Sequence, residues 1–255
     1  MILSDCMVME AIRRYYGTPA GVVAAMKAGV DMVFVCHEPE LQRASADAAL
    51  HALENGELSE NDASLARILA AKARYAFTSA EPELANLPED RQTARTLARK
   101  AITLVSGTLP RPTASTFFCG CADYRMSKAA NADNGAPVFP TDMQRRFGGD
   151  AFVSDARPDG TQIAAIVERA RRADAIVLST CNAHLHREQL ALAKALADTG
   201  VPTTVVALRN PYDLPLLPDS IVKLAAYDYS ADALDAVADV LGGGACVGVP
   251  PVRLG

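Results

Sequence analysis

Short apolar runs alternate with longer amphipathic stretches along this chain, and the alternation predicts an α/β fold. The first apolar run, at residues 2–3, stops at Ser4-Asp5, and a helical pattern over 10–28 follows, with a turn at 17–19. The next run, 31–36, is almost wholly apolar and rich in β-branched residues, which is typical of a strand with apolar neighbours on both faces. Strand, helix and strand in this order predict a parallel pair.

Two further helices are predicted before the pattern changes. They cover 40–55 and 59–75, the second opened by a capping box at Ser59-Glu60-Asn61-Asp62. Residues 78–91 then carry two prolines and several acidic side chains without apolar periodicity, which indicates a linker. We therefore place a first region at 1–76, a linker at 77–92 and a second region at 93–255.

The second region repeats the alternation of strands and helices, which predicts a doubly wound sheet with helices on both faces. The predicted strands are 115–119, 151–154, 175–179, 203–208 and 221–227. The predicted helices are 92–100, which leads into an apolar run at 101–105, and then 141–147, 161–172, 187–199 and 231–241. Residues 120–140 fit neither pattern.

Composition narrows the class of protein. The chain has 255 residues, of which 50% are hydrophobic and 22% charged, with a formal net charge of −5. This is an ordinary globular composition without a basic surface for nucleic acid or anionic lipid. No apolar run approaches the ~20 residues of a membrane span. The N-terminus lacks the features of a signal peptide, so the sequence as written predicts a cytoplasmic chain, with the compartment left open.

The first region poses a physical problem, because two parallel strands with apolar residues on both faces do not form a domain by themselves. The simplest expectation is that the first region is the end of a larger closed sheet whose earlier strands are missing. The alternative is a small sheet completed by the second region or by a second copy of the chain. For the first case we expect exposed strand edges in 1–76 that favour association.

Two residues at the expected carboxyl ends of these strands are candidates for chemistry. Asp5 follows the first apolar run, where catalytic groups of parallel α/β folds gather. An aspartate there serves as a nucleophile, a base, a metal ligand or a helix cap. His37 follows the second strand on the same rim, and we assign it a tentative contact with substrate.

Other motifs favour structural roles. His184-Leu185-His186 lacks a nearby cysteine or carboxylate at metal-ligand spacing, so we expect a solvated pair of loop histidines. Cys119-Gly120-Cys121 has neither redox nor zinc spacing, which favours free thiols. Asp213, in the turn after strand 203–208, is expected to bond turn amides. No metal site and no cofactor are predicted.

At three places the first region resembles the end of the catalytic barrel of family 3 glycoside hydrolases, in the β-N-acetylglucosaminidase (β-N-acetylhexosaminidase) branch. The segments are MILSDCMVMEAI, AAMKAGVDMVFVCHEPE and NGELSENDASLARILAAKARY. The second region resembles the α/β sandwich of two-domain members through ADAIVLSTCNA, LAKALADTGVPTTVVALRNPYDLPLLP and YDYSADALDAVADVLGG. The resemblance implies the last two βα units of a TIM-type barrel followed by a C-terminal α/β/α sandwich.

The resemblance also implies a function. In the family the aspartate of the Ser-Asp motif is the nucleophile of a retaining hydrolase, and Asp5 matches it. The substrate is then a β-linked N-acetylglucosamine-containing saccharide, in carbohydrate metabolism or cell-wall sugar recycling. The family's acid/base histidine and sugar-binding residues lie on earlier barrel loops without a match here. The implied chain is therefore incomplete, and its expected partner is the missing barrel portion or a second copy.

Two other classes of function stay open at this point. One is a non-catalytic α/β assembly or ligand-binding module derived from that family. The other is an unrelated α/β enzyme that uses its own sheet edge.

Overall fold

The computed structural model describes residues 1–59, 62–76, 88–122 and 137–254. These residues fall into two compact units, the first before residue 77 and the second from residue 88 on. In the described part of the chain, no helix is both long and apolar enough to cross a membrane. The division of the chain into domains at 77–92 stays a prediction, and residues 77–87 lie outside the described ranges.

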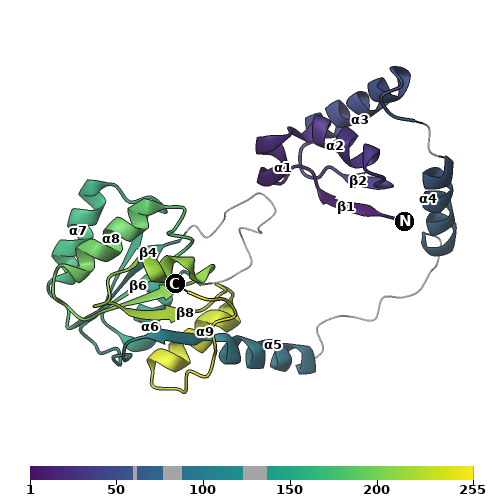
Figure 1. Ribbon diagram of the computed structural model, residues 1–255. Helices are drawn as coiled ribbons and strands as arrows, with labels where there is room; N and C mark the ends of the chain where they lie inside the picture. Colours follow the sequence, from purple (N-terminus) through teal and green to yellow (C-terminus); the bar gives the residue numbers. More distant parts are fainter. Residues whose placement is uncertain (60–61, 77–87, 123–136, 255) are drawn as a thin grey trace. The chain divides into compact units, whose positions relative to one another are not determined.

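The first unit contains one parallel pair of strands and four helices among its described residues (Figure 1). Its elements are β1 (Leu3–Cys6), α1 (Glu10–Tyr15), α2 (Thr18–Lys27), β2 (Met32–Phe34), α3 (Pro39–Glu54) and α4 (Asp62–Tyr75). The pairing of β1 with β2 is parallel, as predicted. Gly17 and Gly29 have φ of 75° and 94°, so glycine provides the left-handed backbone before and after α2. Glu60 and Asn61 of the predicted capping box lie outside the described residues.

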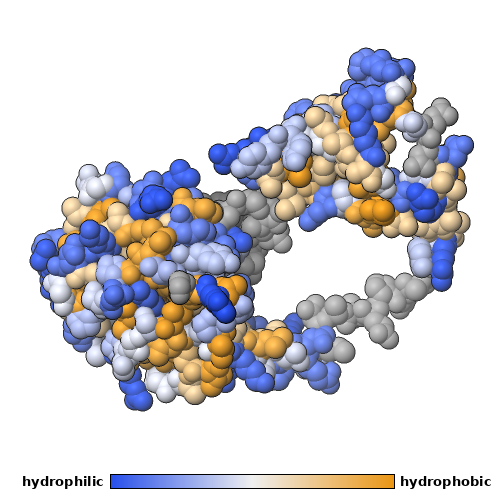
Figure 2. All heavy atoms as spheres, viewed as in Figure 1, coloured by the Kyte–Doolittle hydropathy of each residue, from blue (hydrophilic) through white to orange (hydrophobic). Residues whose placement is uncertain are grey.

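Little of the first unit is buried. Among its described residues the buried apolar side chains are Met7, Val8, Val22, Ala52 and Leu58. The strands themselves are half-exposed, and α4 has no buried residue. Apolar residues are visible on the surface of this unit in Figure 2.

The second unit is a mixed six-stranded sheet covered by helices on both faces (Figure 1), so the predicted α/β class and sandwich are confirmed. Its strands are β3 (Thr103–Ser106), β4 (Thr116–Cys121), β5 (Asp150–Ser154), β6 (Ala175–Thr180), β7 (Thr203–Ala207) and β8 (Val222–Ala225). Its helices are α5 (Pro88–Ala101), α6 (Phe139–Phe147), α7 (Gly160–Ala170), α8 (Arg187–Ala197), the 3-10 helix η1 (Pro211–Leu216) and α9 (Ala231–Leu241). The strand order is β3-β8-β7-β6-β4-β5.

Two apolar cores lie on the two faces of this sheet. On one face Phe118 and Val177 pack with side chains of α6 and α9, including Met143 and Val237. On the other face Phe117, Leu178 and Val205 pack with side chains of α7, α8 and η1. Strands β4, β6 and β7 are buried at every position, which is why near-continuous apolar runs encode them.

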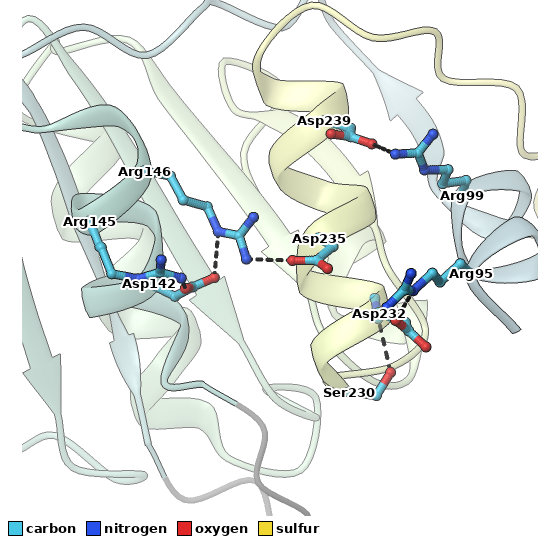
Figure 3. A network of polar contacts seen from close by, with 10 residues as sticks. Arg95, Arg99, Asp142, Arg145, Arg146, Ser230, Asp232, Asp235 and Asp239 are labelled. Carbon is cyan, nitrogen blue, oxygen red and sulfur yellow. Dashed lines mark hydrogen bonds and ion pairs between the residues drawn. The ribbon is translucent and has the colours of Figure 1, made fainter. Parts of the chain in front are cut away.

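Ion pairs between helices reinforce one face (Figure 3). Arg146 on α6 contacts the buried carboxylate of Asp142 at 2.8 Å and reaches Asp235 on α9 at 2.5 Å. Arg99 on α5 pairs with Asp239 on α9 at 2.5 Å. These contacts join α5, α6 and α9 into one layer over the sheet.

Three elements differ from the sequence-based expectation. The apolar run at 101–105 becomes β3, an antiparallel partner of β8, so the sheet is mixed. Helix α5 begins at Pro88, inside the predicted linker range. Within 120–140, which the pattern left unassigned, β4 continues to Cys121 and α6 begins at Phe139, while 123–136 lie outside the described residues.

Candidate functional site

A bulge in β1 shapes the predicted rim. Between the ends of β1, three steps along the chain (residues 3 to 6) face two steps along β2 (residues 32 to 34). The Ser4 hydroxyl fills the gap: its Oγ accepts the Phe34 N–H at 3.0 Å and donates to the Asp5 carbonyl at 2.7 Å. Bulges bend a strand locally and re-aim its side chains, and they are common beside active sites. The extra residue therefore sets the direction of the Ser4-Asp5 step.

Asp5 lies near the carboxyl end of β1 with an exposed side chain, as predicted. One carboxylate oxygen, Oδ1, accepts the backbone N–H of Cys6 at 2.6 Å. The other oxygen, Oδ2, has no hydrogen-bond partner among the described residues. The hydrogen bond from Cys6 fixes the orientation of a carboxylate on an exposed residue.

Two thiols lie beside Asp5. The N–H of Cys36, just beyond β2, donates to Sγ of Cys6 at 3.3 Å. The pKa of the Cys36 thiol is raised, first by its contact with the Cys6 side chain, then by burial, and then by the nearby negative charges of Cys6 and Asp5. The pairing of Cys6 with Phe34 puts this end of β1 beside the end of β2, as predicted.

His37 sits in a strained turn at the same end of β2. The Glu38 N–H donates to the Cys36 carbonyl at 3.0 Å, closing a three-residue turn around His37, whose φ is 70°. This is the rare γ-turn with positive φ, which costs energy in a residue with a side chain. The His37 side chain is exposed and makes no hydrogen bond or ion pair with the other described residues. Its contact with substrate stays a prediction.

A buried carboxylate anchors the opposite end of the strand pair. The Asp31 side chain, 1% exposed, accepts the Ile2 N–H at 2.7 Å and hydrogen bonds from Ser64 at 2.5 Å and Arg67 at 2.7 Å, both on α4. Hydrogen bonds from Arg67, Ser64 and Ile2, in that order, hold the pKa of Asp31 well below its usual range. In the sequence, Asp31 is the first residue of the predicted strand 31–36 and was assigned no role. Its charge in an otherwise apolar run is the signal that distinguishes it.

In the second unit, the expectation that His184 belongs to a solvated pair of loop histidines is wrong. His184 is not part of a solvated pair: its Nδ1 lies 2.8 Å from Oδ1 of the fully buried Asp213, which also accepts the His184 backbone N–H at 2.9 Å. The Tyr212 ring meets the His184 ring edge-on, with centroids 5.8 Å apart. Asp213 thus bonds an amide, as expected, but that amide belongs to the loop after β6. The contact ties this loop to η1.

The other cysteines and histidines show no metal site. Cys119 and Cys121 are buried free thiols, as predicted from their spacing. Among the described residues no group of three or more histidine, cysteine, aspartate or glutamate side chains is arranged to hold a metal ion.

Comparisons with known proteins show which solved structures share this architecture. No family model and no curated protein sequence matches the chain. Solved structures do match it. A glycoside hydrolase family 3 β-N-acetylglucosaminidase from Paenibacillus sp. str. FPU-7 aligns with 100% of the chain and 51% of its own length, at 29% identity and a TM-score of 0.78.

Two more distant structures share the fold. A fungal multi-domain family 3 β-N-acetylglucosaminidase covers 95% of the chain and 29% of its own length, at 20% identity and a TM-score of 0.67. A β-glucosidase from Listeria innocua covers 94% of the chain and 38% of its own length, at 17% identity and a TM-score of 0.58.

The chain therefore has the architecture found in family 3 glycoside hydrolases, as its sequence motifs predicted. Over its whole length the chain is similar to a β-N-acetylglucosaminidase of that family, at 29% identity. It spans about half the length of that enzyme and less than half of the other two.

Proposed function

We propose that this chain supplies the nucleophile of a retaining glycosidase that cleaves β-linked N-acetylglucosamine-containing saccharides. In this proposal Asp5 attacks the anomeric carbon and forms a covalent glycosyl-enzyme, which water then hydrolyses. The observation that carries it is the bulged Ser4-Asp5 step. There a carboxylate is oriented by one hydrogen bond and open at Oδ2. Similarity over the whole chain to a family 3 β-N-acetylglucosaminidase supports the choice of sugar.

The reaction needs a second group, a general acid/base beside Asp5. A retaining glycosidase places a general acid/base about 5–5.5 Å from the nucleophile. In the described ranges no histidine, carboxylate or other acid is bonded to the Asp5 side chain. We propose that the acid/base and the sugar-binding groups come from barrel segments outside these 255 residues. The half-exposed β1 and β2 support this, because further strands would cover them.

A chimera tests the proposal. The part of the Paenibacillus enzyme that this chain does not cover is joined to residue 1, and hydrolysis of an aryl β-N-acetylglucosaminide is compared with that of the 255-residue chain alone. We expect turnover by the chimera and negligible turnover by the chain alone, since a missing acid/base costs ~10²–10⁴-fold and lost positioning costs more.

Asp5→Asn in the chimera identifies the nucleophile. We expect a loss on the order of 10⁴-fold or more, while Asp47→Asn, an exposed carboxylate on α3, leaves the rate unchanged. A 5-fluoro N-acetylglucosaminyl fluoride should label the tryptic peptide of the chimera that contains Asp5 and ends at Arg13, and should not label the Asp5→Asn variant. A well-folded chimera that binds the sugar, yet neither turns over nor labels, would favour the non-catalytic module instead.

A further inference from the structure

Two thiols meet across the strand pair at the rim that carries Asp5. Cys6 is the last residue of β1, and Cys36 is the second residue after β2. The Cys36 N–H donates to Sγ of Cys6 at 3.3 Å, so this sulfur lies against the Cys36 backbone. Both are free thiols of intermediate exposure, so a small reagent can reach them.

The strand register makes these cysteines diagonal neighbours. Cys6 is paired with Phe34, two residues before Cys36. Diagonal neighbours on adjacent strands lie about 7–8 Å apart, just beyond the Cα separation of about 4.4–6.8 Å that disulfides span. Cys36 lies beyond the last residue of β2, so closing an S–S bond requires a small shift of the backbone that follows this strand.

We propose that Cys6 and Cys36 form a reactive dithiol that closes to an intramolecular disulfide by exchange with a small-molecule disulfide such as oxidised glutathione. The Cys6 thiolate attacks one sulfur of the oxidant and releases one glutathione thiolate, leaving a mixed disulfide on Cys6. Cys36 then gives up its proton, attacks the Cys6 sulfur and releases the second glutathione. The protein loses two protons and two electrons, and the oxidant gains them as two glutathione thiols.

The surroundings of the two sulfurs set the order of these steps. The Cys36 N–H aimed at Sγ of Cys6 stabilises negative charge on that sulfur, so Cys6 reacts first and Cys36 resolves. In the same direction, the pKa of the Cys36 thiol is raised by its contact with the Cys6 side chain, by burial and by the nearby negative charges of Cys6 and Asp5. Cys119 and Cys246 are poorer targets, since burial raises the pKa of both thiols and Cys119 is fully buried.

The disulfide has a consequence for the site, which rests on the proposed function. Cys6 carries the backbone N–H that holds the Asp5 carboxylate. Joining Cys6 to Cys36 fixes both strand ends and shifts this donor. Since small misplacements of a catalytic group are costly, we expect hydrolysis by the oxidised chimera to fall roughly 10- to 100-fold and to return with dithiothreitol.

Mass spectrometry of the full chain tests the dithiol without any activity assay. The reduced protein is equilibrated in glutathione buffers of increasing oxidised fraction, quenched in acid, alkylated and digested with trypsin. We expect a species lacking two hydrogens in which peptide 1–13 is linked to peptide 28–43, and its loss on reduction.

Single variants separate the roles of the two thiols. Cys36→Ser should trap a mixed glutathione disulfide on Cys6, whereas Cys6→Ser should leave Cys36 largely unmodified. Cys246→Ser, the matched control, should form the link as the parent does.

The proposal is overturned if both peptides remain singly alkylated in the most oxidising buffer, or if other cysteines are linked instead. Equal glutathionylation of the two single variants overturns the order of attack. A chimera that is inactive in both redox states, with the link formed, counts against the proposed glycosidase and not against the dithiol. A linked chimera with unchanged hydrolysis overturns the effect on the site.

Discussion

Two parallel strand pairs in this chain carry large apolar residues in very different surroundings. In the second unit, β6 and β7 are buried at every position between two layers of helices. In the first unit, Leu3 of β1 is 49% exposed and Phe34 of β2 is 43% exposed. The local sequence determines that a segment becomes a strand. Its burial depends on which elements cover it, and for β1 and β2 the described residues provide few of them.

The comparison predicts unequal costs for the same substitution. Leu178→Ala in β6 removes a side chain that is 1% exposed within a packed core, so we expect a loss of about 2–5 kcal/mol in the free energy of unfolding. Leu3→Ala in β1 should change it by less than about 1 kcal/mol, because the leucine is already half in water. Urea unfolding followed by far-ultraviolet circular dichroism measures both.

An equal loss of unfolding free energy for Leu178→Ala and Leu3→Ala would contradict this difference between the two strand pairs. It would mean that the exposed face of β1 is covered in solution, and a dependence of the Leu3→Ala effect on protein concentration would identify a second copy of the chain as the cover. The chimera should show the opposite change, with Leu3→Ala becoming costly once further strands are present.

The contrast between the two strand pairs also explains which features of the fold could be predicted from the sequence. Strands and helices followed from apolar periodicity, and the parallel pairing of β1 with β2 followed from their order. The position of Asp5 on the rim followed from the end of an apolar run. These features depend on local pattern and on general rules of chain connection, which one sequence contains.

Features that depend on contacts between distant residues were not predicted. The β1 bulge exists because the Ser4 hydroxyl replaces a backbone partner of Phe34. The role of the buried Asp31 is visible only in its contact with Arg67. The role of His184 is likewise visible only in its contact with Asp213. Each partner lies roughly thirty residues away in the sequence, so no local pattern reveals it.

A smaller effect on the free energy of unfolding is expected at two residues with left-handed backbone, one in each unit. His37 in the first unit and Tyr227 in the second have φ of 70° and 62°. Glycine at 37 removes the strain without loss of packing, so His37→Gly should raise the free energy of unfolding by about 1 kcal/mol. Tyr227→Gly should lower it, because the tyrosine packs against the sheet core. His37→Ala, which keeps the strain, is the control, and a gain equal to that of His37→Gly would contradict this account.

The smallest effect concerns the carboxylate that ties α4 to the strand pair. The folded-state pKa of Asp31 lies below the value of about 3.9 expected when unfolded, so its contribution to stability is complete above that pH and is lost as the pH falls through the folded pKa. Amide hydrogen exchange of α4, measured from pH 6 downward and corrected for the intrinsic pH dependence of exchange, should therefore show protection falling below about pH 4. Asp31→Asn should weaken protection at neutral pH and flatten this fall, while Asp47→Asn should retain it. The effect is confined to one helix because α4 buries no side chain of its own. An unchanged acid dependence in Asp31→Asn would show that α4 is held by something other than this carboxylate.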